Sequence, residues 1–182
     1  QYPQQIQLQQ HSAPPVQQQL QQAEPLVLTK EDEIIQALPT RQRSYGLVKR
    51  YISTIHPIIP IIDINEFLAE HDQFWNDRHE NKFEFLGCLF PILYAASKAE
   101  CFEFSYDEIT KYELSNEIHK YLRVAREVLT LINFPLKYSL RILQSAVILQ
   151  STLENPSITD ISILVRIAQS IRLHRDPATF HN

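Results

Sequence analysis

The chain has 182 residues, 44% of them hydrophobic, which is enough for one globular domain with a sizeable core. Only two glycines occur, Gly46 and Gly87, which argues against Gly-rich phosphate loops, dinucleotide-binding folds and β-hairpins. The net charge of −4 gives no reason to expect non-specific nucleic-acid binding by the whole chain.

Two cysteines, Cys88 and Cys101, are too few for a disulfide framework or a zinc cluster, and they suit a reducing intracellular compartment. The polar N-terminus does not resemble a signal peptide, and the longest apolar run, 85–96, is too short to cross a bilayer. We therefore predict no membrane association and no cofactor or metal in this chain. The chain does not begin with Met, so we expect it to be a piece of a longer protein.

The first 28 residues differ in composition from the rest. Gln dominates them, and the first charged residue is Glu24. Such a stretch cannot bury enough apolar surface to offset the entropy lost on ordering, so we predict a low-complexity linker over 1–28. A Gln-rich segment of the kind common in transcription regulators is the alternative. The predicted helical domain is then 29–182.

Helix-capping residues and prolines divide that domain into six or seven helices. Thr29 with Asp32, Asp63 with Glu66, and Ser105 with Glu108 each have the spacing of a capping box. The expected helices cover 29–38, 40–54, 64–76, 83–99, 105–133, 139–154 and a stretch from 157 towards 177. Since no long stretch alternates with period two, we predict an all-α fold, a multi-helix bundle of antiparallel helix pairs.

Apolar spacing identifies the buried faces. The 83–99 helix is apolar all round and should be buried, with a kink at Pro91. The faces expected in the core are Ile118, Tyr121, Leu122, Ala125, Leu129 and Ile132 in the fifth helix, Leu140, Leu143, Val147 and Leu149 in the sixth, and Ile161, Leu164, Val165, Ala168 and Ile171 in the last.

The second expected helix is basic: it carries four cations and no acid. A patch that contacts phosphate is one interpretation, and a solvated helix face is the favoured one. The four residues are Arg41, Arg43, Lys49 and Arg50.

Two stretches resemble the fungal-specific transcription factor domain, or middle homology region, of fungal binuclear zinc-cluster transcription factors. The stretch RIAQSIRLHRDP is similar to the family's A-x-x-L-G-L-H-R-D-P, and YISTIHPIIP is similar to its Y-F-x-x-x-H-P-x-x-P. Arg172 stands where the family usually has glycine, which bears on how this helix ends. The matching residues that we interpret as structural are His56, Pro57, Pro60, Leu173, His174, Arg175 and Asp176.

The resemblance, which covers roughly 45–177, implies the first part of a larger helical regulatory domain. It implies a nuclear regulator of RNA polymerase II transcription, responsive to an effector or a partner. In that family the DNA contacts come from a zinc cluster, which would lie outside this chain. Coactivators or other nuclear proteins, a small-molecule effector and a second copy of the chain are the partners it implies.

Two other functions stay open. One is a non-catalytic helical scaffold subunit of a nuclear chromatin or transcription complex, and the other is an unrecognised helical enzyme. A kinase is disfavoured because His174-Arg175-Asp176 lacks the Asn five residues later, where His181 stands. Neither H-E-x-x-H nor G-x-S-x-G occurs, so we nominate no catalytic residue.

Roles follow for the motif residues. We expect His56 to be packed and hydrogen-bonded, and Leu173 to point into the core. Arg175 should hold exposed carbonyls at the helix end or a nearby carboxylate, and Asp176 should accept backbone N–H groups before Pro177.

Overall fold

The computed structural model describes residues 29–76, 82–103 and 107–175, which contain seven α-helices and no strand. The predicted all-α class is therefore confirmed, while the predicted linker at 1–28 lies outside the described residues. The helices are α1 (Lys30–Gln36), α2 (Arg41–Thr54), α3 (Ile64–Asn76), α4 (Lys82–Glu103), α5 (Glu108–Leu131), α6 (Leu140–Thr152) and α7 (Ile158–Ser170).

Most predicted helix starts are confirmed by their caps. Thr29 forms a complete capping box with Asp32, and Thr40 accepts from the backbone N–H of Arg43 at 3.2 Å. The Asp63 carboxylate accepts from the N–H of Glu66 at 3.0 Å. These bonds satisfy N–H groups that have no partner within their helix.

The start of α5 differs from the prediction. Its N-cap is Asp107, whose carboxylate accepts from the N–H of Thr110 at 2.8 Å and from its hydroxyl at 3.0 Å. The predicted Ser105–Glu108 capping box is wrong, because Glu108 is already the first helical residue; Ser105 lies outside the described residues. A carboxylate next to the first turn accepts two bonds and suits the positive helix end.

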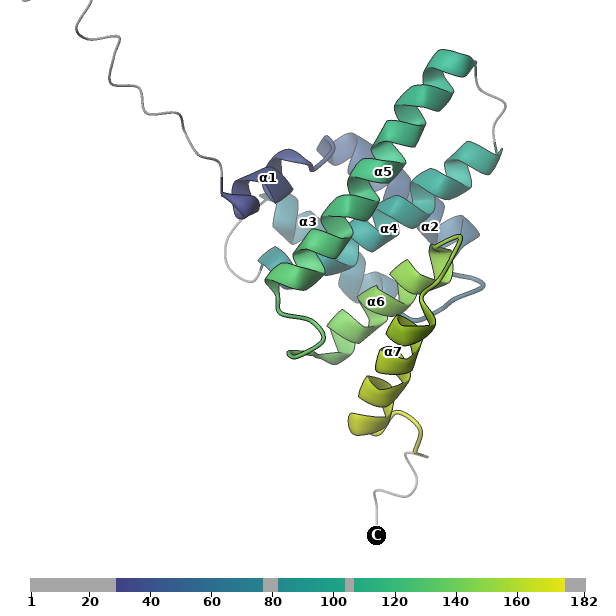
Figure 1. Cartoon of the computed structure of the whole chain (residues 1–182). Helices are drawn as coiled ribbons and strands as arrows, with labels where there is room; N and C mark the ends of the chain where they lie inside the picture. The colour runs from purple at the N-terminus through teal and green to yellow at the C-terminus, as the bar shows by residue number, and fades with distance from the viewer. Residues whose placement is uncertain (1–28, 77–81, 104–106, 176–182) are drawn as a thin grey trace, which may run out of the picture.

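The core is built around α4, which packs against α2, α5 and α6 (Figure 1). Leu86, Leu89, Phe90 and Leu93 are completely buried there. The helix continues through Pro91, and the kink stays a prediction. By length and composition alone, the stretch Phe83–Glu103 could cross a membrane, although the shorter apolar run 85–96 could not. Most of this stretch is buried inside the helical body. A helix that is surrounded by other helices in a protein core is also apolar all round, so this composition fits the buried helix that the structure shows.

A histidine that the sequence reading overlooked connects α2 to α3. His71 is 1% exposed, and its Nε2 lies 2.9 Å from the Ser44 hydroxyl and 3.2 Å from the Trp75 indole nitrogen. Because an indole N–H can only donate, Nε2 accepts and the ring is neutral with its proton on Nδ1. Burial lowers the pKa of His71. The side chain is thus a neutral part of the core, surrounded by Phe67, Phe85 and other aromatic rings.

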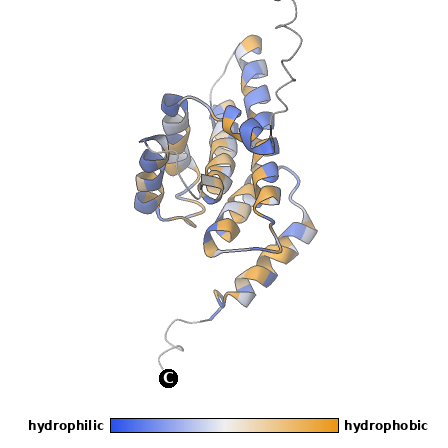
Figure 2. Ribbon diagram, turned by 90° about the vertical axis from the view of Figure 1, so that its left-hand side faces the viewer, coloured by the Kyte–Doolittle hydropathy of each residue, from blue (hydrophilic) through white to orange (hydrophobic). Residues whose placement is uncertain are grey.

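The last helix stands apart from this core. Helix α7 packs chiefly against α6 and extends away from the rest of the molecule (Figures 1 and 2). Its contacts form a second, small hydrophobic cluster centred on Leu143, Ala146, Leu164 and Ile167. Helix α7 therefore has one main neighbouring helix, whereas α4 has three.

Candidate interaction surfaces

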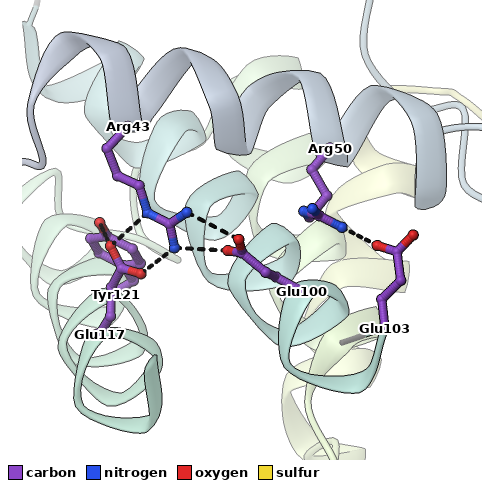
Figure 3. A network of polar contacts seen from close by, with 6 residues as sticks. All are labelled: Arg43, Arg50, Glu100, Glu103, Glu117 and Tyr121. Carbon is purple, nitrogen blue, oxygen red and sulfur yellow. Dashed lines mark hydrogen bonds and ion pairs between the residues drawn. The ribbon is translucent and has the colours of Figure 1, made fainter. Parts of the chain in front are cut away.

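The basic residues of α2 meet acids of the same chain. Arg43 donates from Nη2 to Glu117 at 2.6 Å and to Glu100 at 2.8 Å (Figure 3). Its Nε also donates to Glu117 and its Nη1 to Glu100, so each carboxylate accepts two hydrogen bonds. The Tyr121 hydroxyl donates to Glu117 at 2.6 Å. Helices α2, α4 and α5 are therefore joined by one arginine whose planar group binds two carboxylates.

This network is half-buried, and its electrostatics follow from that. Burial by itself would raise the pKa of Glu117, but hydrogen bonds from Arg43 and Tyr121 outweigh it and hold that pKa below its usual value. Burial, and then the bond to Glu117, raise the pKa of Tyr121. The hydrogen bond to Glu117 raises the pKa of Arg43, so all three groups keep their ordinary charge at neutral pH.

The other cations of the predicted patch are also engaged. Arg50 pairs with Glu103, and Arg41 donates to Asn76 at 3.0 Å and lies 3.5 Å from Asp72. Lys49 lies over the ring of Tyr45, 4.6 Å from its centre. A phosphate would have to displace these partners from the arginine and lysine side chains. The structure therefore does not favour a phosphate-binding role for α2.

An apolar groove lies between α6 and α7. Its volume is about 550 Å³, which lies in the range of small-molecule sites. We call it the α6–α7 groove. It is lined by Ile61, Leu140, Leu143, Gln144, Val147, Gln150, Ser151, Leu153, Pro156, Ile161, Leu164, Val165, Ala168 and Leu173.

The groove corrects the predicted orientation of α7. Leu164 is buried as expected, but Ile161 is 41% exposed and Val165 is 51% exposed, so their predicted burial is wrong. Ile167, which was not predicted, is buried, while Ala168 and Ile171 are half-buried. A helix with one main neighbour buries a narrow stripe of its surface, and the rest of its apolar face stays open to the groove.

The sixth helix is corrected in the same way. Leu143 and Leu149 are buried as predicted, and Val147 is half-buried. The predicted burial of Leu140 is wrong, because this side chain is 48% exposed at the start of α6. It lies on the wall of the groove opposite α7.

Helix α7 ends as a glycine-terminated helix would. Arg172 has a φ of 64°, in the left-handed region, although it is not glycine. The N–H of Leu173 donates to Ala168 and that of Arg172 to Gln169, both at 3.0 Å, which is the Schellman pattern. Arg172 therefore closes the helix as a glycine at this position would, at some conformational cost.

Of the LHRD residues that the structure describes, Leu173 lines the groove, and His174 and Arg175 directly follow it in the chain. Leu173 is 55% exposed, so its predicted inward packing is wrong, although it does line the groove. His174 and Arg175 are exposed. The Arg175 guanidinium has no hydrogen bond to a described residue, so its predicted tie to the helix carbonyls is not seen there. Asp176 and Pro177 lie outside the described residues.

The His-Pro stretch approaches the same groove from α2. His56 is half-buried, and the centre of its ring lies 6.2 Å from the centre of the Tyr51 ring, so its predicted packing is confirmed. Its predicted hydrogen bond is not seen at Nδ1, which is buried and has no partner among the described residues. Pro57 and Pro60 are exposed. The next residue, Ile61, lines the groove, and its carbonyl accepts from the Gln144 amide. Ile61, which directly follows the first of the two stretches, and Leu173 of the second therefore both line the groove.

No cluster of three or more His, Cys, Asp or Glu side chains able to hold a metal ion occurs among the described residues. Both cysteines lie on α4, and both are free thiols. Burial raises the pKa of the Cys88 thiol to about 11, so it is protonated at neutral pH.

Known proteins similar to this chain are transcription factors. They include the equisetin cluster transcription factor of Fusarium heterosporum and the fusarisetin A cluster transcription factor of Fusarium sp. (strain FN080326). Each is 31% identical to this chain over 70 residues, which is 38% of the chain and 10% and 9% of the two relatives, respectively. The match therefore spans about a tenth of their length. No family model matches the chain. No solved structure matches it.

This similarity supports a role in transcription regulation at a coarse level, and transcription factors are in general not enzymes. The fungal-specific domain itself stays a prediction from the motifs.

Proposed function

We propose that this chain is part of the regulatory domain of a fungal nuclear regulator of RNA polymerase II transcription. The observation that carries the proposal is the similarity to two fungal cluster transcription factors. The two stretches that resemble the fungal-specific transcription factor domain add to it, because Ile61, directly after one stretch, and Leu173, within the other, both line the α6–α7 groove.

DNA binding in this proposal belongs to another part of the same protein, a cysteine cluster that holds zinc. Within this chain Arg43 and Arg50 of α2 pair with glutamates, and Arg41 lies 3.5 Å from Asp72, which leaves little free positive charge on that helix. The chain's own contribution is then contact with an effector, a coactivator or another nuclear protein.

A mobility-shift experiment at physiological salt tests this division of labour. The 182-residue chain is expected to show no sequence-selective binding, whereas the full-length gene product binds its promoter DNA. Sub-micromolar, sequence-selective binding by the chain alone would contradict the proposal, because protein–DNA affinity at that salt needs free cations.

The alternative, a scaffold subunit of a chromatin or transcription complex, is favoured by one observation, the open apolar face of α7. The cysteine content of the full-length protein and the proteins that purify with it distinguish the two functions. A six-cysteine cluster in the full-length product supports the regulator. Recovery at fixed stoichiometry with a large complex, without such a cluster, supports the scaffold.

A further inference from the structure

We propose that the α6–α7 groove is the docking site of an amphipathic α-helix that carries acidic side chains. Its apolar residues would fill the groove, and its acids would face the basic end of the groove, where α7 ends. The inference rests on the proposed function for its setting, since it names the partner through which a regulatory domain would act. Its test needs only the purified chain and a peptide.

The shape of the exposed apolar surface favours a helix. Ile161, Val165 and Leu173 are each between 41% and 55% exposed. Ile161 and Val165 lie one turn apart on α7, and Leu173 follows the helix end, so the exposed apolar residues run from the first turn of α7 to just beyond its last. A helix of 13 residues is about 20 Å long. A compact small molecule would cover part of that length, whereas a helix lying along the groove covers all of it with side chains at i, i+3 or i+4, and i+7.

The charge around the groove favours an acidic partner. Arg172, His174 and Arg175 are exposed where α7 ends. Lys137 is exposed next to Tyr138, whose hydroxyl accepts from Ser170 at 3.2 Å, so this loop lies beside the end of α7. With the described residues, Lys137, Arg172 and Arg175 form no ion pair.

The acids near the other end of the groove already have partners. Asp160 accepts from the Gln150 amide at 2.9 Å, and Glu154 lies 3.6 Å from the Lys98 ammonium. A second copy that paired groove to groove would therefore bring to the basic end acids that already have partners in their own chain. A partner with free carboxylates meets the basic end at no such cost, so charge complementarity selects an acidic helix.

Fluorescence anisotropy with the complete chain tests the proposal. The probe is a labelled, helix-forming peptide of about 14 residues, long enough to match α7, with Leu at i, i+3 and i+7 and Glu elsewhere. Its matched control replaces every Glu by Lys. The acidic peptide is expected to bind about tenfold tighter or better than the basic one, and more weakly as salt is raised.

Two pairs of variants locate the binding site. Val165→Asn should weaken binding by about tenfold, while Ile158→Asn, on the same helix but 83% exposed and outside the groove, should leave it unchanged. Arg175→Glu should weaken binding of the acidic peptide, whereas Lys111→Glu, at the start of α5, should not. Equal melting temperatures show that each variant is folded.

Three results would overturn the inference. They are equal binding of the acidic and basic peptides, binding that Val165→Asn leaves intact, and a chain dimer in sedimentation equilibrium that Val165→Asn dissolves and the peptide does not displace. The last result would assign the groove to a second copy. None of these touches the proposed function, which is decided by transcription of a reporter gene.

Discussion

At the scale of single residues, Arg43 explains most about how this molecule uses its charge. It was visible in the sequence as one of four cations on a basic helix, but its two acidic partners are 57 and 74 residues away along the chain. Spacing along one helix cannot reveal such pairs. The result is that a candidate phosphate-binding residue is instead a connection between α2, α4 and α5.

Removing that connection should destabilise the fold. Arg43→Met leaves Glu100 and Glu117, both less than one-fifth exposed, without their shared cation, which should lower the free energy of unfolding by about 2–3 kcal/mol at pH 7. Urea denaturation measures this change. Arg123→Met, which breaks the exposed pair with Glu127, is the control and should cost less than about 0.5 kcal/mol.

The penalty should also depend on pH. Since the pKa of Glu117 is held below its usual value in the folded chain, the network stabilises the protein above that usual value and loses this effect as pH falls. The difference between the parent and Arg43→Met should therefore shrink in acid. A difference that stays constant from pH 7 to acid would mean that packing, not charge, is responsible.

Arg172→Gly should raise stability. An L-residue in the left-handed region costs about 1–2 kcal/mol there, and glycine avoids that cost while losing more backbone entropy on folding, so a net gain of up to about 1 kcal/mol is expected. Chemical denaturation is the measurement. Asn133→Gly, at the equivalent position of α5, is the comparison and should gain less, because Asn tolerates this conformation. A destabilised Arg172→Gly would show that the arginine side chain contributes contacts of its own.

His71 should make the melting temperature fall in mild acid. The unfolded chain binds a proton to this residue near the ordinary His pKa of about 6.5, whereas the folded chain resists it, so stability is full above that pH and declines below it. His71→Gln keeps a polar group but cannot titrate. Its melting temperature should be lower at pH 7 and fall less between pH 7 and 5.5; an unchanged slope would assign the acid sensitivity to other groups.

At the scale of elements, α7 shows what periodicity does and does not determine. The repeat of Ile161, Leu164, Val165 and Ala168 identifies an amphipathic helix, and Ser157 caps it as predicted. Which part of the apolar face is buried depends on the neighbours, and α7 has chiefly α6. Helix α4 was predictable because a helix that is apolar all round is buried whichever way it faces.

Substitutions along α7 should follow the observed burial. Ile167→Ala, at a buried position, should cost about 2–3 kcal/mol because it leaves a cavity, whereas Val165→Ala should cost less than about 1 kcal/mol. Thermal or urea unfolding distinguishes them. Equal costs would mean that Val165 is buried in the core, as the apolar spacing predicts, and would contradict its observed exposure.

At the scale of the whole molecule, one compact core forms around α4. Helix α6 packs against α4, and α7 packs chiefly against α6, so part of the apolar face of α7 stays exposed. The all-α class, the helix order and most helix starts could be predicted, because caps and prolines act locally. The groove could not, because it arises where Ile61, Leu140 and Val165 come together from three separate parts of the chain. The core around α4 stabilises the fold, and the α6–α7 groove leaves an apolar surface exposed at the last helix.

The most direct test of the central claim is transcription itself. The complete chain is fused to a heterologous DNA-binding domain, and a reporter gene carrying that domain's sites is measured in fungal cells against the DNA-binding domain alone. We predict that the fusion changes reporter transcription several-fold, by activation or by repression. A nuclear, stably expressed fusion that leaves reporter transcription equal to that of the DNA-binding domain alone would contradict the account.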